Sequence, residues 1–416
     1  MALAQADLLR LATAGSVDDG KSTLIGRLLF DAKQVLTDQL EHVEEASMRR
    51  GGDGVVDLSL LVDGLRAERE PGITIDVAYR YFATARRTFI IADTPGHVQY
   101  TRNMVTGAST ADLSVILVDA RKGVLEQSKR HAYISALLGI PHLVVAVNKM
   151  DLVDYDEETF DAIVRDFADF ARGLGARDIV YIPISAKHGD NVVDRSEHMP
   201  WYAGTPLLGY LETVKVADDR NLEQARFPVQ WVIRDHENDY RGYAGQIAGG
   251  VLRAGEEVLV LPSEKVTRIA RIDTFDGPLD EACAGMSVTL LLQDEIDISR
   301  GDIICHPGDA PQLARELTAT VCWMADAPLR AGARYAIKHA THAARVVVDE
   351  VLDRVDVHTL SPDGDADALG LNDIGRVRLR TSKPMAFDAY ADNRATGSFI
   401  LIDEATNDTV GAGMIS

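Results

Sequence analysis

The sequence predicts an α/β domain built on a mostly parallel, doubly wound sheet and followed by two β-barrel domains. Two observations carry this prediction. In the first half of the chain, short apolar runs alternate with segments whose apolar residues recur every three or four positions. Further on, the helical repeat largely disappears, and short β-rich runs punctuated by glycine replace it. We place the three domains at residues 1–216, 226–308 and 313–416.

The first domain contains apolar runs of strand length separated by amphipathic segments. The runs predicted as strands are 8–14, 88–92, 113–118, 143–147 and 179–184. The segments predicted as covering helices are 21–36, 127–138 and 157–174. Near-continuous apolar strands of this kind are typical of parallel sheets that are covered on both faces.

The second and third domains are predicted as small barrels that follow a polar, charged stretch at 215–226. Predicted strands of the first barrel are 228–234, 243–252, 257–261, 266–272 and 288–292. The stretch HPGDAP at 306–311 is expected to be a linker. Predicted strands of the second barrel are 318–323, 335–338, 344–349 and 375–380.

Composition limits the classes of partner and compartment. The 416 residues include 43 basic and 64 acidic side chains, for a net charge of −21, which disfavours a broad surface for nucleic acid or for an anionic membrane. We therefore expect neither partner. The apolar runs are far shorter than the roughly 20 residues of a membrane span, and the N-terminus does not resemble a signal peptide, so a cytoplasmic protein is expected.

The cysteines predict neither a disulfide framework nor a zinc site. Only Cys283, Cys305 and Cys322 occur, and no Cys-x-x-Cys spacing is present. His339 and His342 are three residues apart, but without a third ligand we predict solvated barrel residues rather than a metal pair. The three tryptophans, Trp201, Trp231 and Trp323, are predicted to be packing residues.

A phosphate loop is predicted where the first strand meets the first helix. The residues predicted to contact a nucleotide here are Gly15, Ser16, Val17, Asp18, Asp19, Gly20, Lys21, Ser22 and Thr23. The glycines let backbone N–H groups close around phosphates, and the helix N-terminus adds positive potential. Lys21 is expected to reach the β- and γ-phosphates, and the Ser22 hydroxyl to ligate Mg²⁺.

A second phosphate-facing motif, DTPG, follows the strand at 88–92. Its carboxylate, Asp93, stands at a strand end where it can hold the Mg²⁺ shell, and Gly96 can bring its N–H to a γ-phosphate. Upstream, Thr74 offers a hydroxyl and a carbonyl that can close onto the Mg²⁺ ion and the γ-phosphate. Ser22, Thr74 and Asp93 are thus the predicted metal ligands.

Two further motifs end neighbouring parallel strands, where ligands bind in this fold class. Their residues are Asn148, Lys149 and Asp151 after the strand at 143–147, and Ser185, Ala186 and Lys187 after the strand at 179–184. A carboxylate only accepts hydrogen bonds, and guanine offers N1–H and N2–H₂ side by side where adenine does not. Because a site built for such a pair rejects the wrong partner by about 10⁴-fold or more, Asp151 predicts guanine.

The order of these motifs, followed by two barrels, resembles the translation-factor class of GTPases typified by elongation factor Tu. The resemblance implies GTP and Mg²⁺ as ligands. In that family a histidine directly after DTPG positions the attacking water, and His97 stands at that place. Lys21, Thr74 and Gly96 are expected to act with it. The family's guanine-binding positions match Asn148, Lys149, Asp151 and Ala186.

Longer stretches resemble a narrower family, the GTPase subunit of bacterial ATP sulfurylase (sulfate adenylyltransferase). They are 15–31, 62–82, 92–131 and 189–208. The resemblance implies a smaller catalytic subunit that binds ATP and sulfate and makes adenosine 5′-phosphosulfate in sulfate assimilation, driven by GTP hydrolysis here. Some relatives continue into an adenylylsulfate kinase. No second Gly-x-x-x-x-Gly-Lys-Ser/Thr pattern occurs, so the sequence leaves open a stand-alone subunit or part of a bifunctional form, with a fused or associated kinase.

Two alternative functions fit the sequence less well. An elongation-factor-like carrier of aminoacyl-tRNA shares the two barrels, but the charge of −21 argues against it because phosphate contacts dominate nucleic-acid affinity. A GTPase that itself adenylates sulfate needs an ATP site, whereas the recognisable nucleotide site carries Asp151, which disfavours adenine. The adenylyl transfer is therefore expected in a partner.

Overall fold

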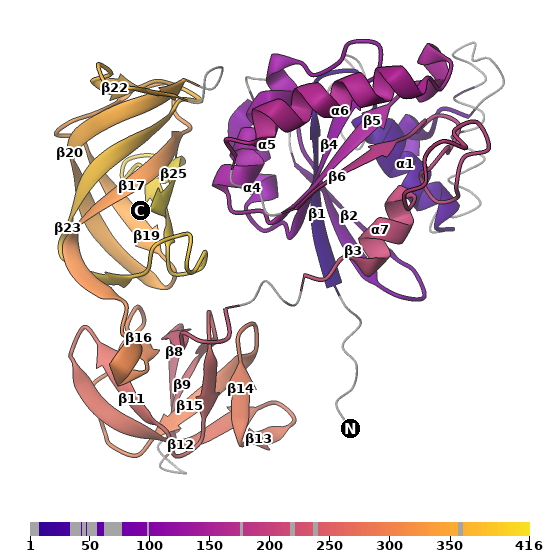
Figure 1. Ribbon diagram of the computed structural model, residues 1–416. Helices are drawn as coiled ribbons and strands as arrows, with labels where there is room; N and C mark the ends of the chain where they lie inside the picture. The colour runs from indigo at the N-terminus through magenta and orange to yellow at the C-terminus, as the bar shows by residue number, and fades with distance from the viewer. Residues whose placement is uncertain are drawn as a thin grey trace. The chain divides into compact units, whose positions relative to one another are not determined.

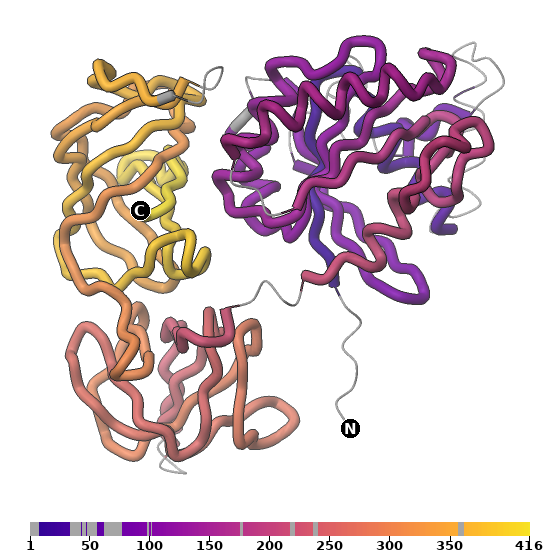
Figure 2. The backbone as a smooth tube through the Cα atoms, in the orientation of Figure 1, coloured from indigo at the N-terminus to yellow at the C-terminus, as the bar shows by residue number. Residues whose placement is uncertain are grey.

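A computed structural model describes residues 8–33, 43, 47, 56–61, 77–97, 100–174, 178–216, 221–235, 240–356 and 361–416. These residues fall into two compact units (Figure 1). The first contains the described residues up to Val216, and the second contains those from Asn221 onward (Figure 2). No helix among the described residues is long and apolar enough to span a bilayer.

The first unit is built on a six-stranded sheet in the order β2-β3-β1-β4-β5-β6. The strands are β1 (Leu8–Gly15), β2 (Ala78–Ala83), β3 (Thr88–Asp93), β4 (Leu113–Asp119), β5 (His142–Asn148) and β6 (Asp178–Pro183). All neighbours are parallel except β2 and β3. The five predicted strands are confirmed. The edge strand β2 was not predicted, because its exposed Tyr79 and Tyr81 break any continuous apolar run.

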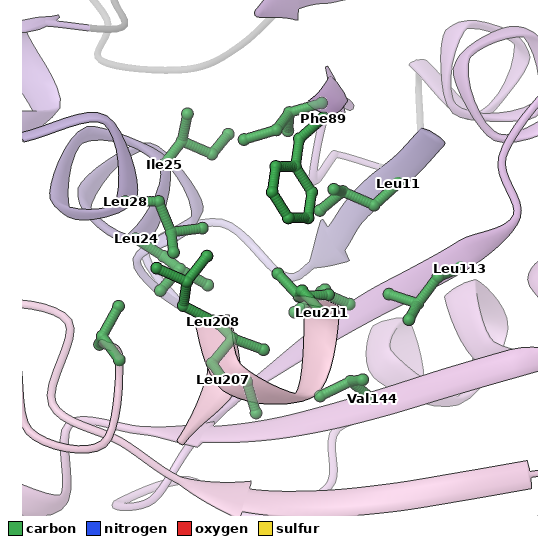
Figure 3. Close-up of a cluster of buried hydrophobic side chains, with 14 of the residues drawn as sticks. Leu11, Leu24, Ile25, Leu28, Phe89, Leu113, Val144, Leu207, Leu208 and Leu211 are labelled. Carbon is green, nitrogen blue, oxygen red and sulfur yellow. The ribbon is translucent and has the colours of Figure 1, made fainter. Parts of the chain in front are cut away.

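Five helices belong to this unit, of which α1, α5 and α6 were predicted and α4 and α7 were not. They are α1 (Lys21–Asp31), α4 (Thr101–Ala108), α5 (Glu126–Leu137), α6 (Glu157–Ala171) and α7 (Leu207–Thr213), with 3₁₀ turns at η1 (Leu58–Leu61) and η3 (Met150–Val153). Asp156 caps α6 by accepting a hydrogen bond from the Thr159 N–H at 2.8 Å. Buried leucines of α1 and α7 share one apolar cluster with Phe89 of β3 (Figure 3).

The second unit contains antiparallel sheets. Its first part comprises β7 (Arg226–Pro228), β8 (Trp231–Asp235), β9 (Tyr240–Gln246), β10 (Val251–Arg253), β11 (Glu257–Leu261), β12 (Lys265–Thr274), β13 (Gly277–Leu279), β14 (Glu281–Cys283), β15 (Ser287–Leu292) and β16 (Ile303–Cys305). The main sheet runs β7-β16-β11-β12-β15-β9-β8 around its own apolar core. A short turn, η5 (Pro307–Asp309), precedes the next strand.

The last part of the chain closes into a second barrel. Its strands are β17 (Gln312–Trp323), β18 (Leu329–Arg330), β19 (Arg334–His339), β20 (His342–Asp356), β21 (Ser361–Asp363), β22 (Ala368–Leu369), β23 (Ile374–Phe387), β24 (Ser398–Ile402) and β25 (Thr409–Ile415). The order β19-β24-β25-β17-β23-β20 returns to β19, which completes the ring. The predicted architecture of one α/β domain and two β-barrels is confirmed.

Two side-chain predictions are wrong, those for His339 and Trp231. His339 is buried, and its Nε2 lies 2.7 Å from the Thr396 carbonyl oxygen, so the prediction of a solvated residue is wrong there. Trp231 is 64% exposed and is not a packing residue, whereas Trp323 is buried as predicted. Burial raises the pKa of the Cys305 and Cys322 thiols to about 12, in keeping with unreactive thiols.

Within the second unit, a buried ion pair joins the first barrel to the second. Arg226 of β7 is 1% exposed, and its Nε and Nη2 donate to both carboxylate oxygens of Asp388 at 2.8–3.1 Å. The Thr396 hydroxyl also donates to Asp388, at 2.6 Å. The remaining guanidinium nitrogen, Nη1, donates to the Asp309 carbonyl at 2.7 Å. These bonds satisfy both charges away from water.

Replacing Asp388 with alanine is expected to destabilise the barrel unit strongly. The change leaves the buried Arg226 guanidinium with only the partly exposed Asp309 carboxylate, 3.8 Å from Nη1, as a counter-charge, which costs about 3–5 kcal/mol of unfolding free energy. Urea unfolding followed by circular dichroism measures the loss. As a control, Glu404→Ala removes the exposed partner of Arg345 and is expected to cost less than about 1 kcal/mol. Equal midpoints for the two variants would contradict this prediction.

Candidate nucleotide-binding site

The predicted phosphate loop connects the end of β1 to the start of α1, and two glycines shape it. Gly15 has a φ of +146° and Gly20 a φ of +93°. A Cβ at Gly15 would lie 2.9 Å from the Leu117 carbonyl oxygen, and one at Gly20 would lie 2.5 Å from the Asn148 side-chain nitrogen. Both the backbone angles and the close approaches therefore require glycine.

Lys21, the first residue of α1, points back into the loop. The side chain is buried, and its Nζ donates to the Gly15 carbonyl at 3.0 Å and to the Ser16 carbonyl at 2.8 Å. Burial lowers the pKa of this ammonium group, and the nearby Asp93 and Asp19 carboxylates partly offset the shift. The Lys21 ammonium group thus lies at the centre of the loop, where its electrostatic attraction for an anionic ligand is strongest.

The DTPG segment packs directly against this lysine. A Cβ at Gly96 would collide with the Lys21 Nζ and would lie 2.7 Å from the Gly15 carbonyl oxygen. The predicted γ-phosphate contact and the predicted phosphate-binding lysine are therefore neighbours, although 75 residues of sequence separate Lys21 from Gly96. His97 follows Gly96, is half-buried, and has its ring centre 6.1 Å from that of Tyr100.

Asp93 lies buried at the end of β3, next to β1. The Thr13 hydroxyl donates to its Oδ1 at 3.3 Å, and the Thr94 hydroxyl donates to the Thr13 carbonyl at 2.5 Å. Ser22 is half-buried at the second position of α1. A carboxylate and a hydroxyl are the oxygen donors that suit a hard cation such as Mg²⁺. Thr74, the third predicted metal ligand, lies outside the described residues.

The Asp19 side chain forms a hydrogen bond within the phosphate loop. Its Oδ2 accepts the Ser16 N–H at 2.6 Å, while Oδ1 is buried without a hydrogen-bond partner among the described residues. Burial raises the pKa of this carboxyl group. Asp18, by contrast, is exposed at the loop tip with a φ of +66°.

Asn148, the last residue of β5, ties the phosphate loop to the loop after β6. Its side-chain nitrogen donates to the Asp19 carbonyl at 2.7 Å, and its side-chain oxygen accepts the Ala186 N–H at 2.9 Å. The side chain is buried, so both bonds are shielded from water. One amide therefore sets the spacing between two of the predicted binding segments.

The carboxylate predicted to read the base is held by the second of these segments. The Ser185 hydroxyl donates to Asp151 Oδ1 at 2.6 Å, and the His188 Nε2 lies 3.7 Å from Asp151 Oδ2. Lys149 adopts a left-handed backbone conformation at the start of η3, and its Nζ donates to the Asp18 carbonyl. The structure thus brings all the predicted residues that it describes to one edge of the sheet.

Asp119 and Arg27 are among the residues that contact this site and were not predicted. Asp119 ends β4 and accepts from Lys149 Nζ at 3.0 Å and from Arg121 Nη2 at 2.7 Å. Burial alone would raise its pKa, but these hydrogen bonds hold the pKa well below its usual range. Its place after an apolar parallel strand was the available signal. Arg27 of α1 donates to the carbonyls of Ala186 and Lys187, at 3.2 and 2.5 Å, and no motif marks it.

Comparison with known proteins assigns all three parts of the chain. Residues 6–232 match the elongation factor Tu GTP binding domain family, residues 244–305 match elongation factor Tu domain 2, and residues 316–416 match the GTP-eEF1A C-terminal domain-like family. Among solved structures, sup35 complexed with GDP aligns with a TM-score of 0.45 and 24% identity, covering 99% of this chain and 94% of that chain.

Two groups of curated relatives match nearly the whole chain. The bifunctional enzyme CysN/CysC of Mycobacterium tuberculosis (strain ATCC 25618 / H37Rv) is 59% identical over 98% of this chain and 67% of that protein. Sulfate adenylyltransferase subunit 1 of Bacteroides fragilis (strain YCH46) is 53% identical over 99% of this chain and 86% of that protein.

Proposed function

This chain belongs to the family of sulfate adenylyltransferase subunit 1, within the elongation factor Tu class of GTPases, and from that membership we propose that it hydrolyses GTP to drive adenosine 5′-phosphosulfate formation. A separate catalytic subunit would bind ATP and sulfate. The observation that carries the proposal is the clustering of Lys21, Asp151 and Gly96 with their bracing residues at one sheet edge. The domain limits proposed are 1–216, 226–308 and 313–416. The division of the chain after Val216 supports the first limit, although the first family match continues to residue 232, and the other two matches lie within the second and third domains.

In the proposed reaction, the phosphate loop and Lys21 hold the triphosphate. Backbone N–H groups of the loop, apart from those of Gly15 and Ser16, which donate to His131 and Asp19, would face the phosphates. The ammonium group of the buried Lys21 would offset the phosphate charge. Ser22 and Asp93, with Thr74, would hold Mg²⁺, which when bound neutralises charge on the phosphates. Gly96 would donate its N–H to the γ-phosphate, and His97 would orient the water that attacks it.

The base would lie against the segments that Asn148 joins. Asp151 would accept from guanine N1–H and N2–H₂, held in place by Ser185. Ala186 and Lys187 would border the base on one side, and Lys149, fixed by Asp119, on the other. A site with this acceptor leaves its carboxylate unpaired when adenine is offered, so ATP is excluded.

Coupling to a partner follows from the chemistry of the two reactions. The phosphate–sulfate anhydride is less stable than the ATP linkage that it replaces, so adenylation needs a second source of free energy. GTP hydrolysis supplies it. The name of the relatives as subunit 1 supports a partner subunit, and the CysN/CysC relatives support a fused kinase in some species. The aminoacyl-tRNA carrier is less supported by these relatives.

The test of this function is reconstitution with the small catalytic subunit. Adenylylsulfate formation from ATP and sulfate is expected to rise when GTP is added, and to stay at the basal level with a nonhydrolysable GTP analogue. Filter binding of aminoacyl-tRNA in the GTP state tests the alternative. Tight tRNA binding without any GTP stimulation of adenylylsulfate formation would overturn the proposal.

Asp151→Asn is expected to move base preference from guanine toward xanthine. The amide can donate to the extra xanthine oxygen but no longer accepts twice from guanine, so GTP affinity falls by about 100-fold or more. Competition binding with GTP, XTP and ATP measures the change. Asp154→Asn, which alters an exposed carboxylate three residues away, is the control and leaves GTP affinity unchanged. Tight GTP binding by Asp151→Asn with no gain for XTP would contradict the base assignment.

A further inference from the structure

A histidine lies buried beneath the phosphate loop and has no part in the reaction described above. His131 belongs to α5, is 1% exposed, and its Nδ1 lies 3.0 Å from the backbone nitrogen of Gly15, which donates to it. Burial lowers the pKa of this ring to about 3, and the positive charges of Lys21 and Arg130 add to the shift. The ring is therefore neutral at physiological pH.

The neutral ring is restricted to one tautomer. Because the Gly15 N–H donates to Nδ1, that nitrogen carries no proton, and the ring proton is on Nε2. Nε2 lies 2.9 Å from the side-chain nitrogen of Gln127, one helical turn earlier on α5. Turning the Gln127 amide over exchanges this nitrogen for the amide oxygen, which is the atom of the group that can accept the Nε2 proton. In that orientation Gln127 keeps Nδ1 free to accept.

Gly15 is the point at which this contact reaches the loop. Its N–H is held by His131, and its carbonyl accepts from the Lys21 Nζ at 3.0 Å. The φ of +146° and the Leu117 oxygen, which a Cβ would approach to 2.9 Å, leave this backbone little freedom of its own. Hydrogen bonds thus link Gln127 to the ring and the ring to the Gly15 N–H. The backbone of Gly15 then connects this N–H to the carbonyl that holds the lysine.

We propose that His131 is a positioning residue for GTP binding and hydrolysis, which fixes the Gly15 peptide and, through the Gly15 carbonyl, the Lys21 ammonium group. The proposal rests on the proposed GTPase function. The proposed effect is pre-organisation of the loop. Affinity for nucleotide falls when part of the population occupies loop conformations that cannot bind, and a loop that is already held in the binding conformation avoids this loss.

The matched variants His131→Phe and His131→Asn separate hydrogen bonding from packing. Phenylalanine fills the ring space but leaves the Gly15 N–H buried and unpaired, so GTP and GDP affinities are expected to fall by about 5- to 100-fold. In asparagine, Oδ1 is the same number of bonds from the backbone as Nδ1 in histidine, so it can accept the same N–H. Its affinities are expected within about threefold of wild type.

Nuclear magnetic resonance of the full-length, ¹⁵N-labelled chain tests the hydrogen bond directly. A scalar coupling across the hydrogen bond is expected between the Gly15 amide nitrogen and Nδ1 of His131, with the ring proton on Nε2. A protonated Nδ1 in the wild-type chain would overturn the proposal whether or not the variants fold.

The binding data have distinct outcomes. Wild-type protein that fails to bind GTP would refute the proposed function itself. If wild-type protein binds GTP and folded His131→Phe binds it equally well, the function stands and the inference is wrong. If His131→Asn binds GTP as weakly as His131→Phe, the ring acts by packing, and this result would also overturn the inference.

Discussion

Replacing Lys21 with alanine is expected to abolish GTP turnover in a chain that still folds. The lysine is buried, and its Nζ contacts the loop carbonyls of Gly15 and Ser16 and lies against Gly96. Removing it takes the single central cation from the site in which charge develops on the phosphates, so the rate should fall by at least about 10³-fold. Phosphate release at saturating GTP measures this effect.

The fold should survive because a buried ammonium is itself costly, as the lowered pKa of Lys21 indicates. Circular dichroism and thermal unfolding check that the variant is folded. Lys33→Ala, which removes an exposed lysine just after α1, is the matched control and should turn over GTP normally. Unchanged GTPase activity in folded Lys21→Ala would count decisively against the assigned role.

Replacing His97 with alanine is expected to slow hydrolysis while nucleotide affinity stays nearly intact. A residue that orients the attacking water acts mainly in the transition state, so kcat should fall by about 10²- to 10⁴-fold. In the reconstituted complex, the GTP-dependent increase in adenylylsulfate should fall by a similar factor. Basal synthesis should persist because the proposed function places the adenylyl-transfer groups in the partner.

GTP binding, phosphate release and adenylylsulfate formation need to be measured in parallel on wild type and His97→Ala. His306→Ala, in the second unit where the ring pairs with Glu256, is the histidine control and should match wild type in all three assays. Normal phosphate release from His97→Ala would remove this residue from the mechanism. Slow release with undiminished GTP stimulation would mean that GTP binding alone activates the partner, and the energy-coupling hypothesis would be wrong.

The parallel sheet was predictable because its strands are buried on both faces. Every residue of β4 is buried, which gives the nearly continuous apolar run that marks such a strand. The edge strand β2 has the opposite character, since exposed side chains alternate along it with half-buried or buried ones, and no continuous run identifies it. In the first barrel, the predicted strand 257–261 is confirmed, whereas the predicted strands 228–234 and 243–252 each span two strands. Strands of the second barrel were predicted shorter than they are. For example, β17 begins at Gln312, six residues before the predicted start, because its first residues are half-exposed.

The candidate site was predictable wherever the chemistry is local in sequence. The phosphate loop and the segments that contain Asp93 and Asp151 are contiguous motifs with a strand before them. His131 and Asp119 escaped notice because their roles depend on partners that only folding supplies. The contact of His131 with Gly15 joins residues 116 positions apart, and the pair between Arg226 and Asp388 spans 162.

The two hydrogen bonds of Asn148 have a consequence for substrate selection. Because one buried amide holds both the Asp19 carbonyl and the Ala186 N–H, the proposed base and phosphate contacts would share one structural support, and their contributions to the binding free energy would not be additive. An ill-fitting base that displaces Ala186 also disturbs the peptide beneath the phosphates. Since small misplacements of reacting groups cost large factors in rate, the wrong nucleotide is penalised a second time, in the speed of its hydrolysis. The proposed site would then select GTP both by its binding affinity and by its rate of hydrolysis.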